Sequence, residues 1–121
     1  MTQSDVGPIA PDRFVAQLLP EHRIDVENTL HHIDVEVQKV SPWTGNPGDG
    51  PGDWSEFIRT QMNGLAYIAG LEAQVDRGIA KECHLALREG VRILDSVRWC
   101  VEESGLHPGY LAVVVKNFRD V

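Results

Sequence analysis

The sequence predicts an all-α protein, because three long stretches repeat their apolar residues at helical spacing and one Gly/Pro-rich stretch separates the first from the second. We expect a helical bundle of three long helices plus short N- and C-terminal segments, with a long Gly/Pro loop between the first two long helices. The 121 residues are expected to form a single helical domain, 1–121, with a flexible N-terminus at 1–10 and the loop at 41–53.

The first long helix is expected to run from Pro20 to Val40. Its apolar residues recur at spacings of four and three and form one stripe along the helix: Val26, Leu30, Ile33, Val37 and Val40. A shorter helix is expected before it, over 11–19. Pro11 suits the first turn of a helix, because its missing N–H leaves no hydrogen bond unmade there.

The second long helix is expected to begin directly after Asp53. Asp53 and Glu56 have the spacing of a capping box, in which the capping side chain accepts a hydrogen bond from the backbone N–H three residues later. The apolar residues that follow are Phe57, Ile58, Met62, Leu65, Ile68, Leu71 and Val75. The 65–71 portion is apolar nearly all round, which predicts a central, well-covered helix. Its small residues are expected to permit close approach by a neighbour: Gly64, Ala66, Ala69, Gly70 and Ala73.

The third long helix carries a similar apolar stripe: Cys83, Leu87, Gly90, Leu94, Val97 and Val101. Gly105 followed by Pro108 predicts its end, with Gly105 free to take the left-handed conformation. Cys83 and Cys100 are too few for a disulfide framework, so both are expected to be reduced thiols.

The tail is ambiguous between helix and strand, because it is rich in β-branched residues, and we expect a short helix. One helical face of the tail is apolar: Tyr110, Leu111, Val114, Val115 and Phe118. This face must either cover the protein's own core or meet another chain. We expect it to meet another chain, because three long helices can already enclose a core.

The charge balance is acidic, with 18 Asp and Glu against 11 Lys and Arg and a formal net charge of −7. Such a surface repels a phosphate backbone, so we expect no direct nucleic-acid binding. An acidic surface also attracts basic proteins and can imitate nucleic acid. The candidates for a clustered acidic face are Asp25, Glu27, Asp34 and Glu36.

The first residues do not resemble a signal peptide, and no apolar run approaches the roughly 20 residues that span a bilayer. We therefore expect a cytoplasmic protein without membrane contact. Arg outnumbers Lys eight to three, which is typical of high-GC genomes, so a bacterial or phage origin is expected. A phage protein could also be associated with the virion.

The Gly/Pro loop is expected to be a connector. A phosphate loop needs a Lys that residues 45–52 lack, and the spacing of Asn46, Asp49 and Asp53 does not match a calcium-binding EF-hand loop. Trp43, within the loop, is expected to fold back onto the bundle as a hydrophobic plug, and it is a candidate interaction residue.

The sequence assigns no catalytic, cofactor-binding or metal-binding residue. No Asp or Glu is followed by a His three residues later, as a di-iron helical bundle requires. His31 and His32 are instead expected to form surface ion pairs with carboxylates four residues away. An enzyme would need an unrecognised site, with Glu82, His84 and Arg88 as its candidates.

The Trp43-Thr44-Gly45 triplet between two helices superficially resembles the WXG family of secreted helical hairpins. Members of that family have a short turn and a Tyr-x-x-x-Asp/Glu export signal. Here the loop is long, and Tyr67 and Tyr110 are each followed four residues later by an aliphatic residue. Membership is therefore not expected.

The helical pair 65–103 resembles the hairpin of phage anti-CBASS proteins, which sequester cyclic oligonucleotides. The matching residues are Lys81-Glu82-Cys83-His84, where those proteins carry Arg-Glu-Asn-Ala, and Trp99-Cys100, where they carry Trp-Leu. The resemblance implies an alternative function, a phage anti-defence protein that sequesters a cyclic oligonucleotide.

These observations together favour a non-catalytic helical interaction protein without a cofactor. It is expected to be a subunit of a protein assembly or a small acidic inhibitor. Its partner is expected to be either another protein or a second copy of itself in a homo-oligomer. The alternatives are cyclic-oligonucleotide sequestration, nucleic-acid mimicry and a small helical-bundle enzyme.

Overall fold

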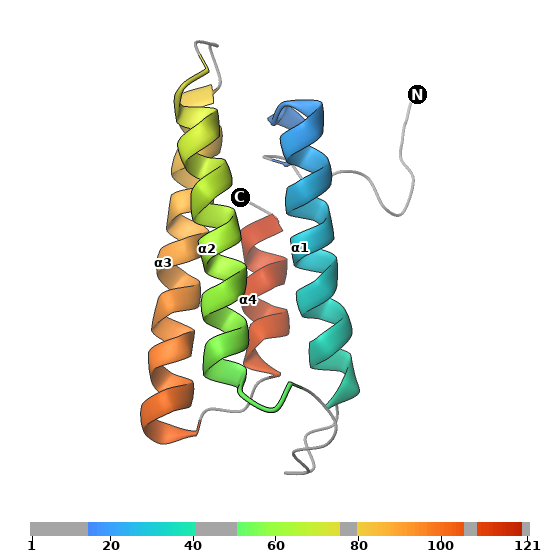
Figure 1. The fold of residues 1–121 in the computed structure, drawn as a ribbon, viewed down its shortest axis with the longest axis vertical. Coiled ribbons are helices and arrows are strands. Elements are labelled where there is room, and N and C mark those ends of the chain that lie inside the picture. Colours follow the sequence, from blue (N-terminus) through green and yellow to red (C-terminus); the bar gives the residue numbers. More distant parts are fainter. Residues whose placement is uncertain (1–14, 41–50, 76–79, 106–108, 120–121) are drawn as a thin grey trace.

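The protein is all-helical in the residues that the computed structural model describes, which are 15–40, 51–75, 80–105 and 109–119. A 3₁₀ turn, η1 (Val15–Gln17), precedes four α-helices: α1 (Pro20–Lys39), α2 (Trp54–Ala73), α3 (Ala80–Ser104) and α4 (Tyr110–Arg119). Successive helices alternate in direction, and α4 packs against α1 and α3, while α1 also contacts α2 directly (Figure 1). The predicted all-α class is confirmed.

Helix α1 forms where its apolar stripe predicts it. The whole stripe is at most 3% exposed: Val26, Leu30, Ile33, Val37 and Val40. Pro20 occupies the first turn, and Lys39 lies in the last turn, where a positive charge is favourable. Of the short helix predicted at 11–19, the described residues show only the single turn η1, and 11–14 lie outside them.

The start of α2 confirms the predicted cap. The backbone N–H of Glu56 donates to Oδ1 of Asp53 over 3.0 Å. The helix ends at Ala73, two residues before the predicted apolar stripe ends. Most of the predicted loop, 41–50, lies outside the described residues, and so does the predicted plug, Trp43.

The prediction that 65–71 is covered all round is wrong. Leu65 and Ile68 are buried, but Tyr67 is 70% exposed. The reason is that α2 has neighbours on only part of its circumference, chiefly α3. Close approach at Gly64 and Gly70 is also not observed, because a Cβ built at either position would have no atom within 4 Å.

The close approach occurs instead at Gly90 of α3. A Cβ at this position would collide with the ring of Phe118 in α4, so only a glycine allows the aromatic ring to rest on the α3 backbone. The predicted α3 stripe is otherwise confirmed, with these residues buried or half-buried: Cys83, Leu87, Leu94, Val97 and Val101. The predicted stop is confirmed as well, because Gly105 has φ +64°.

The tail is a helix, α4, and its apolar face packs into the chain's own core. Four of its residues are at most 6% exposed: Leu111, Val114, Val115 and Phe118. They join the core to which α1, α2 and α3 contribute, and α4 contacts both α1 and α3. These side chains cannot also form a docking surface while this packing is intact, which corrects the expectation of contact with another chain. Only Tyr110, 54% exposed, points outward from that set.

None of the described helices has the length and apolar character needed to cross a membrane.

Candidate functional site

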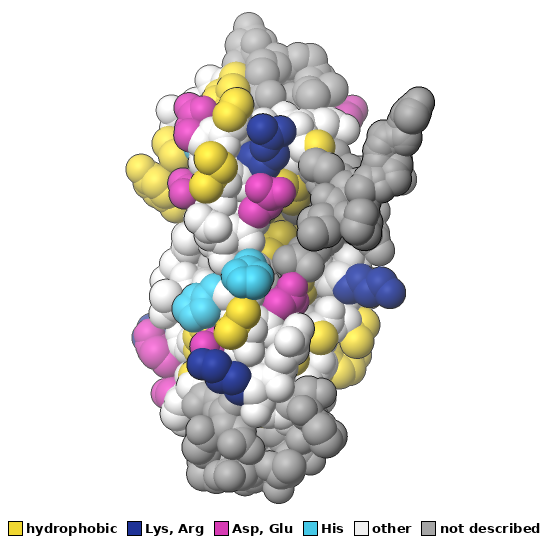
Figure 2. All heavy atoms as spheres, turned by 90° about the vertical axis from the view of Figure 1, so that its right-hand side faces the viewer, with side chains coloured by type: hydrophobic (Ala, Val, Ile, Leu, Met, Phe, Trp, Pro, Cys, Tyr) yellow, Lys and Arg dark blue, Asp and Glu magenta, His cyan; other side chains and the backbone are white. Residues whose placement is uncertain are grey.

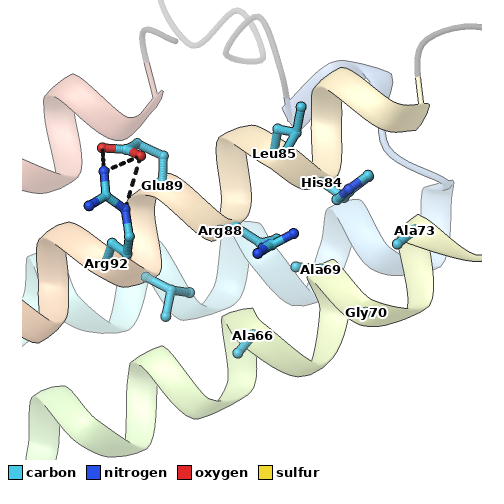
Figure 3. Close-up of a pocket in the computed structure, with 10 residues that line it drawn as sticks. Ala66, Ala69, Gly70, Ala73, His84, Leu85, Arg88, Glu89 and Arg92 are labelled. Atoms are coloured by element: carbon cyan, nitrogen blue, oxygen red, sulfur yellow. Dashed lines mark hydrogen bonds and ion pairs between the residues drawn. The ribbon is translucent and has the colours of Figure 1, made fainter.

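A groove runs along the outer side of the α2–α3 pair, with a volume of about 630 Å³. Four small residues of α2 line it: Ala66, Ala69, Gly70 and Ala73. Because their side chains extend a single carbon at most, α2 forms a shallow floor, and the longer side chains of α3 line the opposite side of the groove (Figure 3). The groove therefore exists because small residues of one helix face large residues of the next.

Two nitrogen-bearing side chains of α3, His84 and Arg88, lie in the space between α2 and α3 (Figure 3). They are four residues apart and so share one face of the helix. Arg88 is exposed, and no carboxylate of the described residues forms an ion pair with it. The groove therefore combines an apolar floor with a positive charge on its rim.

A third nitrogen-bearing side chain, that of Arg92, is neutralised locally by Glu89. Its guanidinium donates to both carboxylate oxygens, with Nη2 at 2.6 Å from Oε1 and 2.7 Å from Oε2. This hydrogen bonding raises the pKa of Arg92 above its ordinary value. Because Arg92 has its own counter-ion, Arg88 contributes most of the unbalanced positive charge.

The three residues of the predicted enzyme alternative do not converge. His84 and Arg88 both line the groove, but Glu82 is exposed and does not. Glu82 lies two residues before His84, which places it roughly 200° around the helix.

The four residues predicted to form an acidic face do not form one. Asp25 and Glu36 are eleven residues apart and share one edge of α1, whereas Glu27 and Asp34 share the opposite edge, about 200° away. Glu36 also has a cationic partner, Lys39, at 2.9 Å. Figure 2, which looks onto the side of the molecule where α1 lies, shows acidic, basic, histidine and hydrophobic side chains interspersed. The described structure therefore offers no single acidic surface on α1.

The predicted surface ion pairs of His31 and His32 appear in part. Nε2 of His32 lies 3.9 Å from the carboxylate of Glu36. The His32 ring also packs edge-on against Phe57 of α2, with centroids 5.2 Å apart, so this histidine contributes to the α1–α2 contact. Among the described residues, no group of three or more His, Cys, Asp or Glu side chains is placed to hold a metal ion. Cys83 and Cys100 do not form a disulfide.

The sequence analysis missed a buried polar pair, His22 and Glu72. Nδ1 of His22 lies 2.5 Å from Oε2 of Glu72, whose side chain is fully buried, and the backbone N–H of Leu19 donates to the same oxygen over 3.0 Å. The contact ties the start of α1 to the end of α2. A signal for it exists, because His22 precedes Val26 by four residues and Glu72 follows Ile68 by four, so each extends an apolar stripe.

Comparison with known proteins gave no result: no protein-family model, no curated protein and no solved structure matches this chain.

Proposed function

We propose that the protein is a non-catalytic helical interaction protein, built as a bundle of three long helices that the short α4 completes. Its docking surface is the α2–α3 face around the groove. The observation that carries this proposal is the exposure of large apolar side chains on these two helices, next to an apolar-floored hollow. Tyr67 of α2 is 70% exposed, and Leu85 and Trp99 of α3 are 46% and 59% exposed.

Two features support a binding role over a catalytic one. The floor of the groove has no functional groups, because it consists of alanine and glycine. The enzyme alternative also requires Glu82 beside His84 and Arg88, but Glu82 does not line the groove. A role as a subunit of an assembly fits better than a role as an acidic inhibitor, because the acidic residues of α1 occupy two separate edges.

Two glycines of α2 allow a matched experiment. Gly70→Leu should fill the groove without disturbing the core, because no atom lies within 4 Å of a Cβ at that position. Gly64→Leu is the control, since Gly64 is equally open and exposed but lies six residues away, on a different side of the helix. Tagged wild type and both variants would be purified from the native host, and the associated proteins would be quantified by mass spectrometry.

The expected result is a partner that is retained by wild type and Gly64→Leu and lost from Gly70→Leu. Loss from both variants would indicate a general effect of leucine on α2, and retention by both would exclude the groove as the docking surface.

A second candidate function is the sequestration of a small anionic ligand, such as a cyclic oligonucleotide. It is favoured by the groove volume, about 630 Å³, which lies within the roughly 300–1,000 Å³ typical of ligand sites, and by the charge of Arg88 on the rim. Isothermal titration calorimetry with cyclic di- and trinucleotides tests it. Binding that Arg88→Ala abolishes would favour this function, and no heat of binding at millimolar ligand would exclude it for those compounds.

A further inference from the structure

The α2–α3 face carries both a hollow and a large exposed aromatic side chain. The groove lies beside Arg88, and Trp99, 59% exposed, lies eleven residues further along the same helix. We propose that a second copy of this chain docks on this face around a two-fold axis, so that each copy inserts its Trp99 into the groove of the other. This inference rests on the proposed function and names the partner of that site.

The outward side of α3 has the spacing of a helix–helix contact. Its residues follow each other at intervals of three and four: Leu85, Arg88, Arg92, Asp95 and Trp99. This heptad spacing makes a straight stripe about 21 Å long, since fourteen residues rise 1.5 Å each. All five residues are exposed, so no element of the described chain covers the stripe.

A two-fold axis perpendicular to α3 would pair the stripe with itself in antiparallel orientation. If the axis passes midway between Arg92 and Asp95, Arg92 of each copy faces Asp95 of the other. The midpoint between Arg88 and Trp99 falls at the same level of the helix, so the same axis sets Trp99 of each copy against Arg88 of the other. One register therefore satisfies both pairs twice, as an isologous interface requires.

The chemistry of the facing groups agrees with this register. Arg92 and Asp95 have opposite charges, and a guanidinium such as that of Arg88 binds the face of an indole by cation–π attraction. The register with the axis half a heptad nearer the N-terminus would set Arg88 against Arg92 of the second copy and is disfavoured by like charge. The existing partners of Arg92 and Asp95 lie on α3 itself: Glu89 is exposed, and Arg98 is half-buried and keeps a second partner, Glu102. Because Arg92 and Asp95 are themselves exposed, their present ion pairs rearrange at little cost.

The groove also suits an indole. Arg88 is the residue that both lines the groove and faces Trp99 of the second copy in this register. The floor beside it is apolar and open at Gly70, where a flat ring can approach the backbone of α2. The inserting side chain, Trp99, and the groove that receives it thus belong to one chain, and their spacing lets each of two copies insert Trp99 into the groove of the other. This favours a second copy over an unrelated protein as the partner. A stripe of this length forms a small interface, and specific complexes bury at least about 1,000 Å² in total. We therefore expect a weak dimer.

Sedimentation equilibrium of the full chain over a wide concentration range measures the association. The wild type is expected to form dimers. Two substitutions should each weaken dimerisation at least about tenfold: Trp99→Ala, which removes the inserted indole, and Gly70→Leu, which fills the groove. Two matched controls should leave it unchanged: Gly64→Leu, and Tyr110→Ala, which removes an aromatic side chain of similar exposure (54%) from α4. Circular dichroism melts verify that each variant is folded.

Mixing Trp99→Ala with Gly70→Leu sharpens the test. The first variant keeps its groove and the second keeps its Trp99, so the mixed dimer regains one of the two insertions. The mixture should therefore associate more strongly than either variant alone and less strongly than wild type.

Three results would overturn the inference: a monomeric wild type at the highest concentration, a dimer that neither substitution weakens, or a mixture no stronger than its components. A further outcome separates the two proposals: the wild type is monomeric, but the Gly70→Leu variant still loses a protein partner that wild type retains. In that case the docking function stands and only the second copy is excluded.

Discussion

Gly90 and Gly70 each lie within a helix, yet one is covered and the other is open. At Gly90 the ring of Phe118 rests on the backbone of α3, and any Cβ would collide with it. At Gly70 nothing lies within 4 Å of a Cβ, and the position forms part of the groove. The α3–α4 contact is thus filled by one large residue, whereas the α2–α3 groove has no such residue from the described part of this chain.

The difference shows that a glycine in a helix does not by itself indicate close packing. What matters is whether a large side chain from another element reaches the glycine. Phe118 reaches Gly90 because α4 packs across α3, while no described element crosses the outer side of α2. The same residue type therefore stabilises the core in one region and leaves a hollow in the other.

The largest expected loss of stability comes from removing α4, the helix that supplies Phe118 to the contact at Gly90. Truncation after Gly105 deletes α4 and its four buried side chains, each of which contributes about 1.5–3 kcal/mol of burial. The sum is comparable with the whole stability of a domain, about 5–15 kcal/mol. The truncated chain should be unfolded or aggregated in circular dichroism and light scattering. A folded truncation of normal helicity would show that α4 is dispensable for the core.

Substituting Glu72 should have the next largest effect. Glu72→Ala removes the acceptor for Leu19 and the partner of His22, and we expect a loss of about 2 kcal/mol in the free energy of unfolding. Glu72→Gln keeps an acceptor oxygen and should cost less. Urea denaturation of the two variants measures the difference in the free energy of unfolding. Equal losses would mean that an acceptor oxygen at this position contributes little to stability.

Gly90→Ala should destabilise the protein by about 1–3 kcal/mol, because its Cβ would collide with the Phe118 ring, although alanine is the better helix former. Phe118→Leu in the same chain relieves the collision, so the two substitutions should be non-additive. A double-mutant cycle from thermal or urea unfolding checks this. Strict additivity would show that the ring does not rest on Gly90 in solution.

The smallest effect on stability is expected at the open glycines of α2, where a substitution should stabilise the protein instead of destabilising it. Gly70→Ala and Gly64→Ala should each raise the free energy of unfolding by about 0.5–1 kcal/mol, since alanine favours the helix and both positions have room for a Cβ. Chemical denaturation of the two variants measures it. Destabilisation by Gly70→Ala alone would mean that another part of the molecule occupies the groove.

Much of the fold could be predicted from local sequence signals. The buried stripe of α1, the cap at Asp53 and the left-handed Gly105 each depend on residues within a few positions of one another, where helix geometry alone sets the outcome. The candidate site could be predicted only in fragments. His84, Arg88 and Trp99 were noted in the sequence, but the groove needs the small residues of α2 opposite them, and that pairing is not visible within one helix.

By itself, then, the sequence determined the buried stripes of α1 and α3, the start of α2 and the end of α3, because spacing and capping act over one or two turns. The tertiary structure decided three matters: that the α4 face lies in the chain's own core, that Gly90 rather than Gly64 or Gly70 is the point of close approach, and that His22 meets Glu72. Each depends on side chains 28 to 50 residues apart or on how four helices share a core. Such contacts are set by packing, to which every helix contributes at once.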